Sequence, residues 1–416
     1  MWKRWRTRIF LFLAVLGPGF ITANVDNDSG GILIYSQAGA QYGYTLLWTM
    51  IPITLALIVV QEMCARMGVV TGKGLSDLIR EEFGLRLTVI LMVLLVVVNF
   101  TNVITEFIGI AGSLHLFHVS KFISVPICAT LVWFLVVRGD YKSTEKVFLI
   151  ASLVYVTYIF TGVLSQPSWH DALWATIKLP SNTVWHDKSY IYMAIGIVGT
   201  TIAPWMQFYL QSSIVEKGIR VKDYAASRLD VFVGSFFTDL IAWFIVVACA
   251  ATLFIHGMGA IQVAADAAEA MRPLAGDYAF ILFAFGLFNA SIFAASILPI
   301  STAYTVCEGL GVESGVDKSF REAPFFYWLY TLLIAGGGLS VLLLPDTQLI
   351  NVAILSQVLN GVLLPVVIIL MLLLINRSDL MGEFKNSRIW NIIAWATSII
   401  VIGMTVAMLW GMMPGH

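Results

Sequence analysis

The chain of 416 residues is 59% hydrophobic and only 12% charged, with a mean hydropathy of +0.87. A soluble domain normally has about a quarter charged residues, so much of this apolar surface must face lipid. The net charge of -1 gives no large basic or acidic field, which argues against nucleic acid as a partner.

Many stretches of the chain are long and apolar enough to cross a membrane, which takes about 20 mostly apolar residues. The sequence predicts eleven spans, at 9–40, 46–64, 87–114, 121–137, 147–165, 189–212, 229–255, 279–305, 325–344, 348–374 and 389–411. Since the polar connections between them are short, we expect an all-α membrane protein with a single transmembrane domain over residues 1–416 and no attached soluble domain.

The distribution of Lys and Arg predicts the orientation, because cytoplasmic loops carry an excess of these residues. With the N-terminus in the cytoplasm, all but four of the 24 Lys and Arg residues lie on the cytoplasmic side; the four are Lys121, Lys178, Lys188 and Arg272. We therefore expect a multi-pass protein of the cell membrane, with a cytoplasmic N-terminus and, after eleven spans, an extracytoplasmic C-terminus. We expect it to be a monomer.

The first span is interrupted near its middle by polar residues and glycines. They are Asp26, Asn27, Asp28, Ser29, Gly30 and Gly31. Backbone polar groups in hydrocarbon must be satisfied within their own segment, so unwound backbone is tolerated only where it lines a cavity or is buried in protein. The sequence predicts that this helix is not continuous through residues 26–31.

The sixth span is interrupted in a similar way. It contains Gly196, Gly199, Thr200, Thr201 and Pro204. Because Pro204 lacks a backbone donor and clashes with the preceding turn, we expect the helix to break there.

The two interrupted helices are five spans apart and so enter the membrane from opposite sides. This offset is what an inverted repeat requires, and paired interrupted segments mark the binding site of many transporters. The topology predicts two inverted five-helix repeats, at about 9–165 and 189–374, followed by one extra helix at about 389–411.

The carboxylate of Asp28 is the first candidate for cation binding. An acid at the bilayer centre costs about 2.5–3.5 kcal/mol on insertion scales and is functional by default. The alternative is an Asp that only caps a half-helix. For Asp26 a functional and a structural role are equally open, and Asp26 and Asn27 could contact an ion directly or through water. Carbonyls of Val25 and Thr200 could complete an oxygen-rich site for a hard cation.

Other polar residues at membrane depth are weaker candidates. Glu106 in the third span indicates an ion or proton pathway, or else a protonated packing residue. Gln357 and Asn360 in the tenth span are neutral, and a hydrogen bond between helices is the alternative to a ligand role. The histidines lie at span ends or in loops without ligand spacing, so we expect no bound zinc, haem or other cofactor. No Ser/His/Asp set lies at membrane depth, so we expect no enzyme.

Several motifs resemble those of the NRAMP family of divalent-metal transporters. Gly17-Pro18-Gly19-Phe20 and the segment 37–44 (QAGAQYGY) are separated by sixteen residues, as in the family. Further matches are Ala65-Arg66-Met67-Gly68 with the residues up to Lys73, Glu106-Phe107-Ile108-Gly109, Leu355-Ser356-Gln357-Val358 and Asp379-Leu380-Met381-Gly382. The resemblance covers nearly the whole chain and implies a LeuT-type fold with broken helices 1 and 6.

The departures from the family pattern are concentrated at the site. The family's D-P-G-N falls on Asp28-Ser29-Gly30-Gly31, so the acid is kept and the amide ligand becomes Gly31. The family's helix-6 methionine falls on Ala203, and an acid three residues before the helix-3 glutamate falls on Val103. The resemblance thus implies a metal site at Asp28, Val25, Gly31, Thr200, Ala203 and Gln357, with Asp26 and Asn27 adjoining it and Glu106 on an ion or proton pathway.

These losses favour a hard cation. A thioether favours transition metals, whereas Mg²⁺ prefers oxygen and gives up its waters reluctantly. We therefore expect uptake of partly hydrated Mg²⁺, with Mn²⁺ as a further substrate, by alternating access with weak or no proton coupling, as in the NRAMP-related magnesium transporter branch. The alternatives are an ordinary proton-coupled Mn²⁺/Fe²⁺ transporter, a non-transporting sensor or signalling relative, and a sodium-coupled amino-acid carrier of the same fold.

Overall fold

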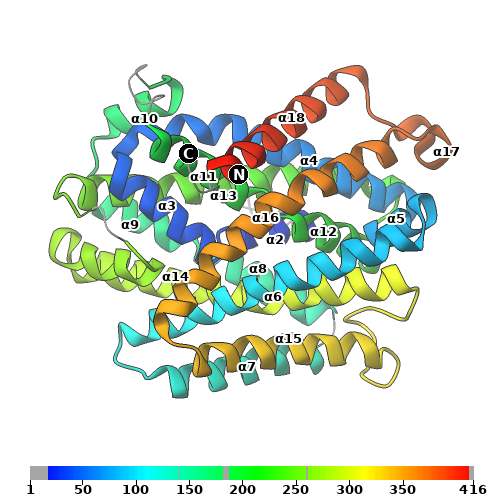
Figure 1. Ribbon diagram of the computed structural model, residues 1–416, viewed down its shortest axis with the longest axis horizontal. Helices are drawn as coiled ribbons and strands as arrows, with labels where there is room; N and C mark the ends of the chain where they lie inside the picture. The colour runs from blue at the N-terminus through cyan, green and yellow to red at the C-terminus, as the bar shows by residue number, and fades with distance from the viewer. Residues whose placement is uncertain (1–16, 140, 181–186, 259–260, 412–416) are drawn as a thin grey trace, which may run out of the picture.

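The computed structural model describes residues 17–139, 141–180, 187–258 and 261–411, and this part of the chain folds into a bundle of helices (Figure 1). The first half contains α2 (Pro18–Val25), α3 (Ser29–Tyr42), α4 (Met50–Thr71), α5 (Leu75–Phe83), α6 (Leu85–His115), α7 (Lys121–Val137), α8 (Tyr141–Val154), α9 (Val156–Leu164) and α10 (Trp169–Ile177). The second half contains α11 (Lys188–Thr201), α12 (Pro204–Glu216), α13 (Tyr224–Cys249), α14 (Ala264–Leu310), α15 (Pro324–Leu343), α16 (Asp346–Ile375), α17 (Ser378–Met381) and α18 (Arg388–Gly411).

By length and composition, nine segments of the described residues could cross a membrane, and Lys121–Val137 is a shorter apolar helix. The expected spans 9–40 and 46–64 share one of the nine, Ser29–Thr71, because the 3₁₀ turn Gly43–Thr49 joins α3 directly to α4. Residues 9–16 of the first expected span lie outside the described residues.

Both expected interruptions are present. The first helix stops at Val25 and restarts at Ser29, so the break is shorter than the sequence predicted and Ser29, Gly30 and Gly31 are helical. The second lies between Thr201 and Pro204, where Ile202 and Ala203 leave the helical conformation. Proline at the first position of α12 explains this restart, because its missing N–H and fixed φ suit a helix N-terminus.

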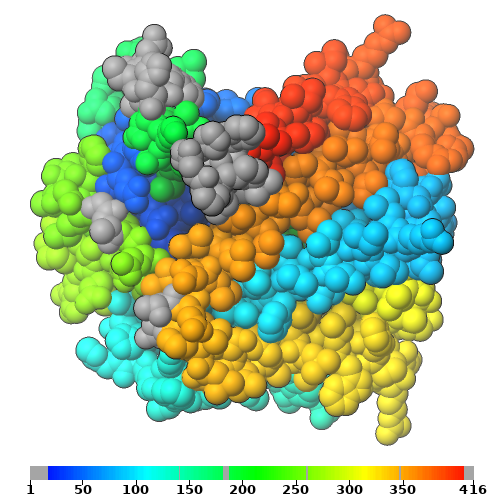
Figure 2. Space-filling model, viewed as in Figure 1, coloured from blue at the N-terminus to red at the C-terminus, as the bar shows by residue number. Residues whose placement is uncertain are grey.

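The two breaks lie in the centre of the bundle. Helix α13 packs along α2, α3 and α4, while α6 crosses both α14 and α16. Helices α7 and α15 lie side by side along one edge in Figure 1, with large apolar side chains such as Leu131 and Trp328 exposed, as lipid-facing helices require. On the face seen in Figure 2, α16 runs between α6 and α18.

The two ends of the bundle differ in the short helices they carry. In Figure 1, α5 and α17 lie at one end and α10 at the opposite end. Helices α5 and α10 lie outside the expected spans, and the expected span 147–165 is divided at Tyr155 into α8 and α9. The end with α5 and α17 holds basic loops that the sequence predicts to be cytoplasmic.

Candidate functional site

Asp28 lies at the first break and caps α3. Its backbone is extended (φ -73°, ψ -179°), and its Oδ1 accepts a hydrogen bond from the amide of Gly31 at 2.7 Å. The capping role considered as an alternative is therefore real. A carboxylate has about four acceptor positions, so capping leaves Asp28 able to bind a cation as well.

The break removes the usual helical donors from several backbone carbonyls. In a continuous helix the Ser29 amide would bond to the Val25 carbonyl, but it donates to Glu106 Oε2 at 3.1 Å instead. The Gly31 amide likewise bonds to the Asp28 side chain and not to the Asn27 carbonyl. The end of α2 therefore presents carbonyl oxygens at the break, that of Val25 among them.

Gly31 sits where oxygen atoms from both broken helices converge. A Cβ atom at Gly31 would lie 2.6 Å from the Asp26 carbonyl oxygen and 3.4 Å from both Asp28 Oδ1 and Thr200 Oγ1. At Gly30, a Cβ would collide with the side-chain amide of Gln357 and lie 3.4 Å from Asp28 Oδ1. The absence of side chains at both glycines thus lets α11 and α16 bring polar groups up to Asp28.

At the second break Thr200 has more oxygen atoms free to bind a cation than Ala203 has. The helical partner of the Thr200 carbonyl would be the amide of residue 204, which is proline and has none. The Ala203 carbonyl accepts a hydrogen bond from the backbone amide of Met206 at 3.2 Å. It also accepts one from the side-chain amide of Gln207 at 2.7 Å, in the orientation of that amide that satisfies its oxygen and nitrogen. Ala203 therefore contributes a small side chain, while Thr200 contributes oxygens.

Glu106 adjoins the first break from α6. The side chain is 1% exposed, and apart from the bond between its Oε2 and Ser29 it has an Oε1 without a partner among the described residues. A Cβ at Gly109, one turn further along, would clash with the hydroxyls of Ser29 and Ser291. Gly109 therefore allows α6 to approach α3 closely enough for Glu106 to reach the break.

Asn360 forms a hydrogen bond between helices, which was one of the two roles considered for it. It exchanges two side-chain hydrogen bonds with Asn102 of α6, at 3.0 and 3.1 Å. The pair joins α16 to α6, whereas Gln357, one turn earlier on α16, faces Gly30.

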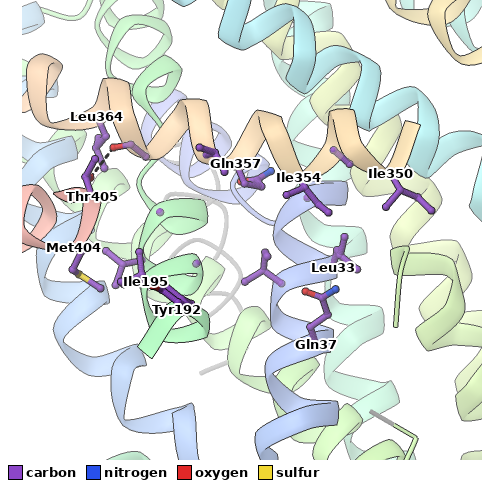
Figure 3. A pocket seen from close by; sticks show the side chains of 18 of the residues that line it. Leu33, Gln37, Tyr192, Ile195, Ile350, Ile354, Gln357, Leu364, Met404 and Thr405 are labelled. Carbon is purple, nitrogen blue, oxygen red and sulfur yellow. Dashed lines mark hydrogen bonds between the residues drawn. The ribbon is translucent and has the colours of Figure 1, made fainter. Parts of the chain in front are cut away.

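A cavity of about 740 Å³ leads from the breaks toward the end of the bundle that carries α10. Figure 3 shows Gln357 of α16 on one wall, Leu33 and Gln37 of α3 on another, and Tyr192 of α11 across from them next to Ile195. Gly30 also lines it, so the cavity ends next to Asp28, which is 9% exposed.

A second cavity of about 660 Å³ approaches the break from the other side of α3. Its lining includes Ser29, Thr105 and Gly109, which surround Glu106, and it shares Leu33 with the first cavity. Residues next to Asp28 and Glu106 in the chain thus line hollows on either side of α3.

The sequence analysis missed two acids of α13, Asp230 and Asp239, which are buried at 2% and 4% exposure. Both fall inside the expected span 229–255, so the rule that intramembrane carboxylates are functional candidates could have found them. Among the described residues no group of three His, Cys, Asp or Glu side chains could hold a metal ion. A cation here would depend on backbone, hydroxyl and amide oxygens around one carboxylate.

The family model described as natural resistance-associated macrophage protein-like (Nramp) matches residues 19–411. A divalent metal cation transporter MntH from Nostoc sp. is 27% identical over 420 residues, covering 96% of this chain and 92% of the relative. A manganese transporter from Eremococcus coleocola, solved with an aromatic bis-isothiourea compound, is 23% identical with a TM-score of 0.71 and covers 95% of this chain and 86% of that one.

The similarity in fold extends to more distant transporters. Mhp1, a nucleobase-cation-symport-1 family transporter solved with bromovinylhydantoin, has a TM-score of 0.59 at 12% identity, covering 95% of this chain and 92% of its own. At such low identity the match shows the fold alone. It confirms the expected all-α, LeuT-like architecture.

Proposed function

Since the chain belongs to the Nramp family and is a divalent metal cation transporter, not an enzyme, we propose that its principal cargo is Mg²⁺. The observation that supports this cargo most directly is the convergence at Gly31 of three oxygens, from the Asp28 carboxylate, the Asp26 carbonyl and the Thr200 hydroxyl. Hard Mg²⁺ prefers such ligands, whereas thioether and imidazole groups favour transition metals.

Space at the site also favours a cation that keeps part of its water shell. Ala203 stands where the family pattern has a thioether, and its short side chain leaves room at the end of the second broken helix. Gly31, which stands where the pattern has an amide, lets the Asp26 carbonyl and the Thr200 hydroxyl approach Asp28. Mg²⁺ dehydrates reluctantly and is usually bound with several waters. We propose that Asp28 and the carbonyls of Val25 and Asp26 bind the partly hydrated ion with Thr200, while Gln357 contacts its waters.

The proposed direction of transport is inward. With the N-terminus in the cytoplasm, the end that carries α10 faces outside, and the 740 Å³ cavity gives access to Asp28 from that side. A dication gains about 4.6 kcal/mol per 100 mV of inside-negative potential, which is enough to drive accumulation by alternating access. The two inverted repeats, 9–165 and 189–374, would exchange access around this site.

We propose that transport is coupled weakly or not at all to protons. Val103 replaces an acid of the family pattern and is fully buried on α6. A Cβ at Gly337 would touch Val103 and Phe107, so α15 packs closely onto an apolar surface at this position. Glu106 would then act in positioning Ser29 and the break more than in passing protons onward.

A proton-coupled Mn²⁺ transporter is the second candidate. The names of the relatives favour manganese as the ion but say nothing of protons: the Nostoc protein is called the divalent metal cation transporter MntH and the Eremococcus protein a manganese transporter. The donor set at Gly31 favours Mg²⁺, although oxygen ligands also accept Mn²⁺.

Uptake into proteoliposomes with Mg²⁺, Mn²⁺ and an internal pH-sensitive dye separates these candidates. We expect Mg²⁺ to enter under an inside-negative potential without acidification, and Mn²⁺ to compete with it. Entry of Mn²⁺ together with protons, while Mg²⁺ neither enters nor competes, would contradict the proposal.

A further inference from the structure

An ion pair joins the end of α12 to the start of α8. The Nζ atom of Lys217, which directly follows α12, lies 2.6 Å from Oε1 of Glu145 on α8. Helix α12 runs from the second break toward the end of the bundle that carries α5 (Figure 1). Both side chains are half-buried, so their attraction is screened less than that of a fully exposed pair.

The loop between α14 and α15 adds a second connection between the same two helices. The Asp317 carboxylate in this loop accepts a hydrogen bond from the backbone amide of Tyr141, the first residue of α8, at 2.8 Å. The Asp317 amide donates to Oε1 of Glu216 at the end of α12, also at 2.8 Å. The Tyr141 hydroxyl also donates to the Ser213 carbonyl of α12 at 3.4 Å. Helices α8 and α12 are thus connected both directly and through the loop.

The start of α2 lies against the ion pair. A Cβ atom at Gly17 would be 2.5 Å from Lys217 Nζ and 3.3 Å from Glu145 Oε1, so this approach requires glycine. Helix α2 also packs against α8 and α12. Because α2 and α12 are the halves of the two broken helices on this side of the breaks, the pair connects both half-helices to α8.

The space between these helices is nearly closed. A cavity of about 10 Å³, roughly the size of one water molecule, lies between α2, α8, α12 and α14. Ile21, Tyr209 and Ile300 line it, and all three are buried. The cavity of about 740 Å³, in contrast, opens toward the end that carries α10. An ion at the breaks can therefore leave on the α5 side only after α2 or α12 has separated from α8.

We propose that the Lys217–Glu145 pair and the Asp317 bridge form a latch that holds the cytoplasmic side closed and releases when α12 separates from α8. The inference rests on the proposed alternating access around Asp28, but not on which ion is carried. The attraction between Lys217 and Glu145 stabilises only the outward-facing conformation. Its loss therefore shifts the population toward the inward-facing one.

The test is the rate at which a maleimide labels Ile300→Cys, in the closed cavity, in the purified full-length protein. We expect Glu145→Gln and Lys217→Gln each to raise this rate about fivefold. Losing a carboxylate and losing an ammonium change the intrinsic reactivity of a nearby thiol in opposite directions, so faster labelling in both variants reports access to the cavity. The exchanged pair, Glu145→Lys/Lys217→Glu, should return the rate toward that of Ile300→Cys alone.

Two controls separate opening from a general loosening of the fold. Lys73→Gln breaks an ion pair with Glu81, also 2.6 Å long, that does not connect α8 with α12, so it should leave the labelling of Ile300→Cys unchanged. Ile354→Cys reports on the 740 Å³ cavity, and in both latch variants it should be labelled more slowly, whereas a loosened fold would not protect it. The four native cysteines are buried, and the protein without an introduced cysteine gives their background.

Unchanged labelling of Ile300→Cys in both Glu145→Gln and Lys217→Gln would overturn the latch, and so would faster labelling at positions 300 and 354 together. If a variant of the pair fails to fold, Asp317→Ala removes the other connection and is expected to speed labelling at position 300 in the same way. Labelling requires no transported ion. If the latch variants behave as expected while the wild type takes up neither Mg²⁺ nor Mn²⁺, the proposed function fails and the latch stands.

Discussion

The carboxylate of Asp230 accepts a hydrogen bond from the backbone amide of Gly19 at 2.8 Å. The amides of Gly17 and Phe20 donate to the same carboxylate at 2.8 and 3.1 Å, so one side chain of α13 satisfies three amides at the start of α2. The approach requires glycine at position 19, where a Cβ would lie 2.9 Å from the backbone nitrogen of Val231. These contacts hold α2 in place at the end of the bundle opposite the two cavities.

Replacing Asp230 with asparagine is expected to release α2. Hydrogen bonds to a charged group contribute about 1.5–3 kcal/mol each, so their weakening shifts the population of α2 positions about tenfold or more. The measurement is the rate of thiol labelling at Thr22→Cys, a position that is fully buried. Labelling should be faster in Asp230→Asn/Thr22→Cys than in Thr22→Cys alone, and equal rates would show that Asp230 does not restrain α2.

Restoring the family's thioether is expected to change selectivity. The variant Ala203→Met adds a thioether at the second break without the collision that a side chain at Gly31 would make with the Asp26 carbonyl oxygen, so the ratio of Mn²⁺ to Mg²⁺ uptake should rise about tenfold. Uptake of both ions in proteoliposomes measures this ratio. Ala203→Leu is the control, because leucine fills similar space without sulfur; a similar ratio in both variants would exclude a role for thioether softness.

The Thr200 hydroxyl is expected to contribute to ion binding. Thr200→Val keeps the shape of the side chain but removes the oxygen that faces Gly31, and we expect it to raise the KM for Mg²⁺ about tenfold, the lower end of the effect of losing a metal-site partner. Thr200→Ser keeps the oxygen and should stay close to the wild type. If both variants have the wild-type KM, the hydroxyl does not participate.

The Asn102–Asn360 pair is expected to matter for stability and not for selectivity. Hydrogen bonds between transmembrane helices contribute about 0.6 kcal/mol on average and at most about 1.7 kcal/mol, so Asn360→Leu should lower the melting temperature modestly. Thermal unfolding in detergent measures this effect, and the ratio of Mg²⁺ to Mn²⁺ uptake should not change. A changed ratio would instead place Asn360 in the binding site.

The positions of the two breaks could be predicted because their cause is local. Polar residues at 26–28 cannot continue a lipid-facing helix, and Pro204 interrupts the hydrogen bonding of any helix. The extent of the first break was predicted less well. Gly30 and Gly31 have low helix propensity, but the Asp28 cap restarts the helix at Ser29 and overrides that propensity.

Contacts between distant segments could not be predicted from one sequence. Nothing local distinguishes Gln357, which reaches Gly30, from Asn360, which pairs with Asn102. Asp239 was missed for a different reason: it interrupts no helix, so no break in the apolar pattern marks it. Its burial next to Thr238, the residue that bonds to Asn27, appears only once the chain is folded.

Mg²⁺ uptake by wild-type and Asp28→Asn protein, reconstituted in the same vesicles under an inside-negative potential, tests the central claim most directly. The wild type should accumulate Mg²⁺ without acidifying the lumen, while Asp28→Asn, folded to the same extent by size-exclusion chromatography, should fall to the level of empty vesicles. Equal Mg²⁺ uptake by the two proteins would contradict the assignment of Asp28 as the main ligand and with it the proposed site.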